Sequence, residues 1–143
     1  MNPQALAEAL LAARAAGRPA TLPPALDLAS AWRVSALAEQ RLIASGRTPR
    51  GWKIGFTNRT IWPRYGVHQP IWGRVWDDTL TLLDATEATL SLAGLSEPRL
   101  EPEIVFAFAR APEPGMDEAA LAGCMAWVAH GVEIVHTHIG WRF

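Results

Sequence analysis

The first fifty residues carry the apolar spacing of two helices. In residues 2–16 apolar side chains recur at helical intervals, and Gly17 and Pro19 follow where the helix should end. Residues 25–45 repeat the spacing, and Gly46 is the expected C-cap. The inward positions predicted for the two helices are Leu6, Ala9, Leu10, Ala13, Val34, Leu37, Ala38 and Leu42. These residues predict helical packing and no chemistry.

After Gly51 the pattern changes to short β-prone segments separated by turn residues. A strand is predicted in "GWKIGFTN", followed by a loop or short helix broken by Pro63, Gly66 and Pro70. Further strands are expected at 71–76, 80–83, 88–92 and 99–109. The change near residue 50 separates a helical cap, residues 1–50, from a β-rich body, residues 51–143. The predicted fold class is therefore α+β.

Helical spacing returns in residues 112–131. Leu121, Cys124, Met125 and Val128 fall at i, i+3, i+4 and i+7, and Gly131 is placed to end the segment. The run "VEIVHTHI", residues 132–139, is then the last predicted strand. A helix followed by a strand is thus expected at the end of the chain.

The segment "RLEPEIVFAFARAP", residues 99–112, places two acids at the head of an apolar run that is expected to be buried. In a strand, Glu101 and Glu103 share one face with Val105, whereas Ile104 and Phe106 point the other way. Two neighbouring carboxylates near a core repel each other and lose hydration, so they need a cation, a shared proton or open water. A divalent metal ion is the cation that this pattern favours.

A third acid strengthens the metal hypothesis. Glu133 lies in another apolar segment, where a carboxylate without a partner is costly. Three carboxylates, with water completing the shell, suit a hard cation such as Mg²⁺ or Mn²⁺. His136 and His138 are a weaker candidate, because strand geometry turns them away from Glu133, and packing or a polar edge is the preferred interpretation.

Composition excludes several other classes of protein. The 143 residues amount to one domain, and the net charge of −1 comes from scattered charges, which argues against nucleic-acid binding. No run is long enough to cross a membrane and no secretory signal is evident, so a soluble cytoplasmic protein is expected. Cys124 is the sole cysteine and is predicted to be a small buried side chain.

Four spaced motifs together resemble a known family. The stretches "GWKIGFTN", "GVHQPIWGRVWDDTL", "LEPEIVFAF" and "GVEIVHTHIGWRF" occur in the order seen in the fumarylacetoacetate hydrolase superfamily. They are most similar to its branch of 2-keto-4-pentenoate hydratases and 2-oxo-acid decarboxylases. The resemblance implies a β-roll body in which Glu101, Glu103 and Glu133 bind the metal. It also implies an active-site role for Lys53 and for one of Asp77 and Asp78, without deciding which.

The function implied by this resemblance is a Mg²⁺- or Mn²⁺-dependent hydratase, a lyase that adds water to a 2-hydroxy-2,4-dienoate during the degradation of aromatic compounds. Decarboxylation of a 2-oxo-enedioate and hydrolysis of an acylpyruvate are alternatives within the superfamily. A non-catalytic domain that binds a partner subunit, with the acids on a solvated surface, is an alternative of another class. The expected partner of the enzyme is a small 2-oxo or 2-hydroxy-dienoic acid, and the full-length form is expected to be a homo-oligomer.

The end of the sequence adds two expectations. Family chains continue for about as much sequence again, so these residues are expected to be a fragment with an incomplete β-roll that associates and turns over poorly. The segment "EIVHTHI" also departs from the family, which often has Asp and Arg at this place, so no role is carried over to the two histidines.

Overall fold

A computed structural model describes residues 2–23 and 25–141, and the chain divides into two compact units. The first unit comprises residues 1–12 and 21–91, and the second comprises residues 13–20 and 92–143. Helices and antiparallel strands occur together, so the predicted α+β class is confirmed. The predicted boundary near residue 50, between a cap and a catalytic body, stays a prediction.

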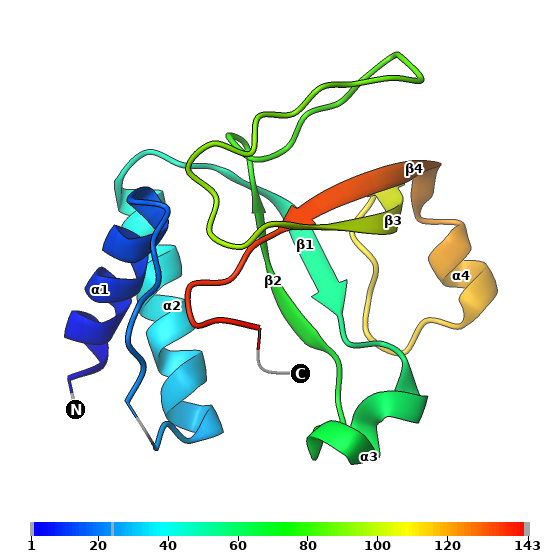
Figure 1. Ribbon diagram of the computed structural model, residues 1–143. Coiled ribbons are helices and arrows are strands. Elements are labelled where there is room, and N and C mark those ends of the chain that lie inside the picture. Colours follow the sequence, from blue (N-terminus) through cyan, green and yellow to red (C-terminus); the bar gives the residue numbers. More distant parts are fainter. Residues whose placement is uncertain (1, 24, 142–143) are drawn as a thin grey trace. The chain divides into compact units, whose positions relative to one another are not determined.

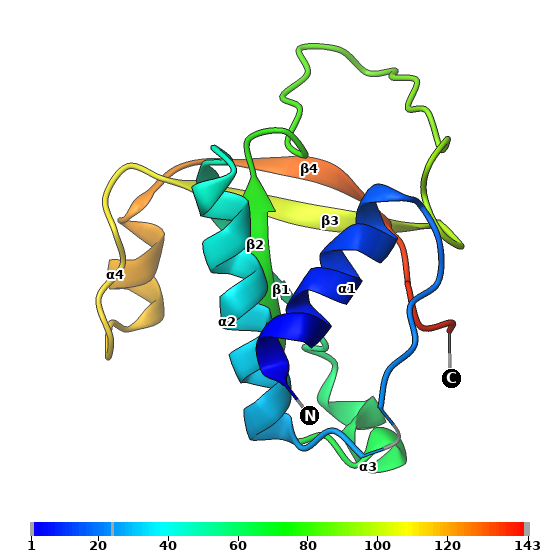
Figure 2. The same ribbon diagram turned by 90° about the vertical axis from the view of Figure 1, so that its left-hand side faces the viewer.

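The two predicted helices are α1 (Pro3–Ala15) and α2 (Leu28–Ala44), which lie side by side in Figures 1 and 2. Helix α2 and the residues of α1 up to Ala12 belong to the first unit. Leu6 and Ala7 of α1 pack with Val34 of α2 in a small apolar core. The side chain of Asp27 caps α2 by accepting a hydrogen bond from the backbone N–H of Ser30 at 2.7 Å. Helical spacing in the sequence therefore identified both elements.

A two-stranded antiparallel ribbon completes the first unit. Strands β1 (Pro49–Gly55) and β2 (Ile71–Trp76) pair with each other, and the short helices η1 (Arg59–Ile61) and α3 (Trp62–Tyr65) lie between them in sequence. Trp72 of β2 stacks on Trp32 of α2 with ring centroids 4.6 Å apart. Arg74 reaches the same helix through a 2.7 Å bond from its Nε to Glu39 Oε1. One face of the ribbon is thereby attached to α2.

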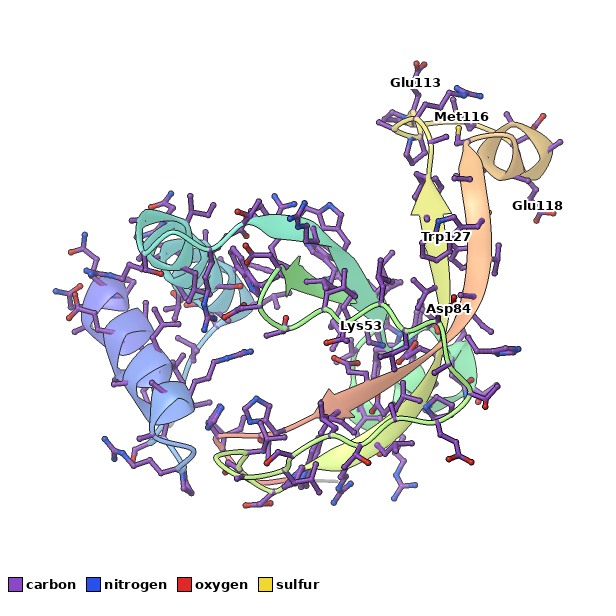
Figure 3. The ribbon with its side chains drawn as sticks, turned by 90° about the horizontal axis from the view of Figure 1, so that it is seen from above. Lys53, Asp84, Glu113, Met116, Glu118 and Trp127 are labelled. Carbon is purple, nitrogen blue, oxygen red and sulfur yellow. The ribbon has the colours of Figure 1, made fainter. Side chains whose placement is uncertain are left out.

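A second antiparallel ribbon dominates the second unit, where β3 (Arg99–Phe108) pairs with β4 (Met125–Val135) and the short helix α4 (Glu118–Ala122) precedes β4. Asp117 caps α4 by accepting from the N–H of Ala120 at 2.8 Å. The predicted burial of Cys124 is confirmed, because its side chain is fully buried. Figure 3 shows Glu113, Met116 and Glu118 grouped at the α4 end of this ribbon.

The expected strands at 80–83 and 88–92 are wrong. Residues 77–98 contain neither helix nor strand, and leucines 80, 82, 83, 90 and 92 are exposed. An apolar run becomes a strand only when its backbone finds a pairing partner, and this segment has no ladder in the described part of the chain. Local β propensity was therefore a poor guide here.

The predicted helix over 112–131 is also wrong outside Glu118–Ala122. Strand β4 begins at Met125, runs through Gly131 and ends at Val135, so the last strand starts earlier and stops sooner than "VEIVHTHI" predicted. Short apolar runs fit helical and strand spacing alike, and pairing with β3 decides between them. Met125 and Val128 thus lie in a strand although they fall at helical intervals from Leu121.

The apolar face of β3 is exposed, contrary to the expectation that it is buried. The side chains of Ile104, Phe106 and Phe108 have relative solvent exposures of 54%, 48% and 44%. Val105, on the face of the acids, is half-buried. A two-stranded ribbon has one pairing partner for each strand and leaves its faces open unless another element covers them. The segment that the sequence predicted to be a core strand is an open ribbon in the described residues.

Candidate metal centre

Three acids meet on one face of the β3–β4 ribbon. Glu101 pairs directly with Glu133 across the strands, and Glu103 lies two residues farther along β3 on the same face. One carboxylate oxygen from each lies within 4.8 Å of the other two. Glu101 is exposed, whereas Glu103 and Glu133 are half-buried. The structure therefore brings together the three residues that the sequence singled out as metal ligands.

The spacing of these oxygens fits a divalent cation. Opposite ligands of an octahedral Mg²⁺ are about 4.2 Å apart, and those of Ca²⁺ are about 5 Å apart. All three oxygens lie within 4.8 Å of one another, a separation of the size that one ion can span. A donor set made only of carboxylates suits hard cations better than it suits zinc or copper. The three side chains thus lie close enough together to be ligands of one ion.

A glycine occupies the position opposite Glu103. Gly131 is the register partner of Glu103, so the four facing positions hold three acids and one residue without a side chain. A Cβ atom built on Gly131 would lie 2.6 Å from Cγ2 of Val105 and 3.7 Å from Cβ of Glu103. The methyl group of Val105 therefore occupies the space that a side chain at position 131 would take.

Lys53 belongs to the other unit, on β1, where Figure 3 marks it. It faces Gly73 across the ribbon, and Gly51 and Gly55 are its neighbours on the same face. A Cβ atom on Gly51 or Gly73 would meet nothing within 4 Å, and one on Gly55 would meet only the Ile71 side chain, at 3.7 Å. The ribbon around the half-buried lysine thus leaves space beside its stem.

The turn after Lys53 is strained. Phe56 has a φ of 57°, in the left-handed region that a bulky residue rarely adopts. Its carbonyl oxygen accepts a 2.8 Å hydrogen bond from the Trp62 indole N–H, and its ring meets Tyr65 edge to face. These contacts hold the chain reversal that follows the "GWKIG" strand, and hydrophobic periodicity gave no signal for them.

Asp77 and Asp78 have partners at the end of the β1–β2 ribbon. Asp77 accepts the backbone N–H of Thr48 at 3.1 Å and donates its own N–H to the Thr48 carbonyl at 3.0 Å. The hydrogen bond from the Thr48 N–H lowers the pKa of Asp77 below its ordinary value of 3.8. Asp78 forms an ion pair with Arg47 at 2.8 Å. Both acids thus brace the ribbon end, and a role of either one near a substrate stays a prediction.

The two C-terminal histidines lie beyond β4. Nδ1 of His136 accepts the N–H of Ser96 at 3.5 Å, and Nδ1 of His138 lies 3.0 Å from the carbonyl oxygen of Arg18. Their rings meet edge to face with centroids 4.7 Å apart. Burial, followed by the charges of Arg14 and His138, lowers the pKa of His136. These contacts agree with the packing interpretation of the pair.

The two halves of the predicted active site lie in different units. Glu101, Glu103 and Glu133 form one cluster in the second unit, and Lys53, Asp77 and Asp78 belong to the first. A site shared by both sets stays a prediction. Among the described residues, no helix has the length and apolar character needed to cross a membrane.

Comparison with known proteins supplies the class to which this chain belongs. The chain is 32% identical over 141 residues to the 2-hydroxyhexa-2,4-dienoate hydratase of Comamonas testosteroni, covering 97% of this chain and 53% of that one. It is also 32% identical over 119 residues to the 2-keto-4-pentenoate hydratase of Paraburkholderia xenovorans, covering 81% of this chain and 42% of the relative. No protein-family model matches the chain.

A solved structure shows the same fold. The 4-oxalocrotonate decarboxylase from Pseudomonas putida G7, complexed with magnesium and adipate, superimposes with a TM-score of 0.80 at 24% identity. The match covers 96% of this chain and 53% of that chain, so the chain spans about half the length of the relatives that it matches. The chain belongs to the hydratase and decarboxylase branch of the fumarylacetoacetate hydrolase superfamily.

Sequence reasoning missed Gly131 and Gly73, which face Glu103 and Lys53 across their ribbons. The sequence predicted that a helix ends at Gly131, and a residue at the end of a helix has no cross-strand partner. The pairing of Gly131 with Glu103 was therefore not expected. Had residues 125–135 been recognised as a strand, antiparallel pairing of Glu133 with Glu101 would have placed Gly131 opposite Glu103. A glycine within a strand is itself a signal of close approach.

Proposed function

We propose that this chain carries the metal-binding part of a hydratase that adds water to a 2-hydroxy-2,4-dienoate in the degradation of aromatic compounds. The observation that supports this most directly is the convergence of Glu101, Glu103 and Glu133 within 4.8 Å on one ribbon face. Several relatives named as hydratases of such substrates support the reaction type.

The acids are proposed to hold Mg²⁺ or Mn²⁺. The neighbouring decarboxylase was solved with magnesium in one structure and with calcium in another, which supports a divalent cation of the hard type. When bound, such an ion supplies positive charge for the carboxylate and C2 oxygens of a 2-oxo acid. The three glutamates would hold it on the face of the ribbon.

Lys53 is proposed to bind or protonate the substrate. Its ammonium can donate a hydrogen bond to a substrate carboxylate or a proton to the substrate. The three glycines around its stem allow a small acid to approach the strand closely. One of Asp77 and Asp78 is proposed to lie near the same substrate, with the other bracing the ribbon.

Decarboxylation of a 2-oxo-enedioate is the second candidate reaction. A relative 32% identical over 101 residues is named as a 4-oxalocrotonate decarboxylase, and the solved neighbour has the same name. Both reactions develop negative charge on the C2 oxygen of the substrate. An ion held by the acid cluster would therefore serve either reaction.

Product analysis distinguishes the two reactions. The protein is incubated with Mg²⁺ and either 2-hydroxypenta-2,4-dienoate or 4-oxalocrotonate, and products are identified by mass spectrometry. Hydration of the dienoate without release of CO₂ supports the proposal, and Glu103→Gln should abolish it. Turnover of 4-oxalocrotonate alone would favour the decarboxylase. Absence of specific Mg²⁺ binding would favour the non-catalytic partner-binding domain instead.

A further inference from the structure

We propose that Gly131 and Val105 form a steric pair that positions the Glu103 carboxylate for metal binding. The inference rests on the proposed function, because it assumes that Glu103 is a ligand. Gly131 itself has no side chain to offer to an ion, so its contribution would be made through its neighbours. Val105 and Glu103 are separated by one residue on β3 and share the face of the acids.

The distances around Gly131 show how the pair works. The γ-methyl of Val105 lies 2.6 Å from the position of an added Cβ, which is closer than two carbon atoms can approach. Valine has few rotamers in a strand, so this methyl cannot leave at low cost. The added Cβ would also come into van der Waals contact with Cβ of Glu103, at 3.7 Å. The Val105 methyl group and a methyl group at position 131 therefore cannot both occupy this space.

This geometry predicts reciprocal effects of two substitutions. Gly131→Ala forces Val105 out of its place and brings a methyl group into contact with Cβ of Glu103, so Mg²⁺ affinity should fall about tenfold. Val105→Ala empties the space between Gly131 and Glu103 that its methyl group occupies, and affinity should fall about threefold because Glu103 gains rotamer freedom. In the double variant, the methyl group introduced at position 131 replaces the one lost at position 105. The Mg²⁺ affinity of the double variant should lie within about threefold of the original protein.

The experiment is a double-mutant cycle read by calorimetric titration with Mg²⁺ and by Mn²⁺ binding in electron paramagnetic resonance. Val128→Ala is the matched control for Val105→Ala, because Val128 is a valine of the same ribbon that pairs with Phe106 on the face away from the acids. Circular dichroism checks that each variant is folded. If Gly131→Ala does not fold, the comparison of Val105→Ala with the double variant still tests the inference.

Recovery in the double variant supports the steric pair. Additive losses, giving about a thirtyfold weaker double variant, would overturn it, as would a Gly131→Ala protein that binds Mg²⁺ normally. Failure of the proposed function has a different signature. In that case the original protein binds no Mg²⁺ specifically, or Glu103→Gln binds it equally well, and the inference falls with the function.

Discussion

Replacing Glu103 with Gln should change protein stability in opposite directions with and without metal. The substitution keeps the shape of the side chain and removes one of three negative charges that lie within 4.8 Å of one another. Without a cation those charges repel. With a cation, each of them stabilises the bound ion.

The spacing of the carboxylate oxygens gives the scale of this repulsion. Two unit charges 4.8 Å apart repel by about 0.9 kcal/mol in a medium as polar as water, and by more where water is excluded. Glu103 takes part in two such pairs, with Glu101 and Glu133, so this mutual repulsion amounts to about 2 kcal/mol before salt screening and apart from the other contacts of these side chains. At physiological ionic strength we expect about 1 kcal/mol to remain, which corresponds to a melting temperature about 3 °C higher for Glu103→Gln in EDTA.

Added Mg²⁺ should reverse this order. A ligand present at about one hundred times its Kd stabilises the folded state by about 2.7 kcal/mol. The original protein gains this stabilisation, whereas Glu103→Gln loses a charged ligand and gains much less. Differential scanning calorimetry measures the melting temperatures of both proteins, first in EDTA and then in a series of Mg²⁺ concentrations. Glu113→Gln removes an exposed acid of the same unit and is the matched control.

Two results would refute this reasoning. If Glu103→Gln melts at a lower temperature in EDTA, the acids do not repel as the geometry requires. If Mg²⁺ raises the melting temperature of the variant as much as that of the original protein, the cluster does not bind the ion through Glu103.

Three further predictions concern Lys53, Asp77 and His136. Lys53→Met should weaken binding of a 2-oxo acid roughly tenfold and spare Mg²⁺ affinity, because it removes a charged donor; equal binding of the acid in a titration would contradict the role. The depressed pKa of Asp77 means that its contribution to stability is present above pH 3.8 and is lost as the pH falls through the lower, folded value. Urea denaturation should therefore find Asp77→Asn less stable at pH 7 and closer to the original protein below pH 4, and a constant difference would be inconsistent with the hydrogen bond to Thr48. The pKa of His136 is lowered from 6.5, so folding should weaken as the pH falls below 6.5, and His136→Gln should reduce that slope in melts between pH 7.5 and 5.

Local spacing in the sequence predicted those elements whose partners lie close by. Helices α1 and α2 could be predicted because each carries an apolar stripe, and the two stripes pack against each other. Strands β1 and β2 could be predicted because turn residues delimit them. The failures lie where a partner decides the structure. The sequence spacing of Leu121, Cys124 and Met125 suits a helix, but residues from Met125 onward extend to pair with β3. The leucines of residues 80–92 have strand spacing and no pairing partner in the described chain.

The acids were identifiable from the sequence for a separate reason. A carboxylate in an apolar strand is costly wherever its strand lies, so Glu101, Glu103 and Glu133 stood out before any pairing was known. What the sequence did not provide was the register that joins them. Because the predicted helix extends to Gly131, the place of this glycine opposite Glu103 could not be predicted.

Register is therefore the property that connects this fold to its candidate chemistry. A slip of one residue between β3 and β4 would turn Glu133 to the face of Ile104 and Phe106 and leave Glu101 and Glu103 without it. The observed register passes through a bulge between Ala107 and Phe108, beyond which the pairing shifts by one residue. The bulge lies at the α4 end of the ribbon, so the acids keep a regular ladder while the irregularity falls away from them. A metal ion bound by all three acids would stabilise only the correct register, and folding of this ribbon and metal binding would then be coupled.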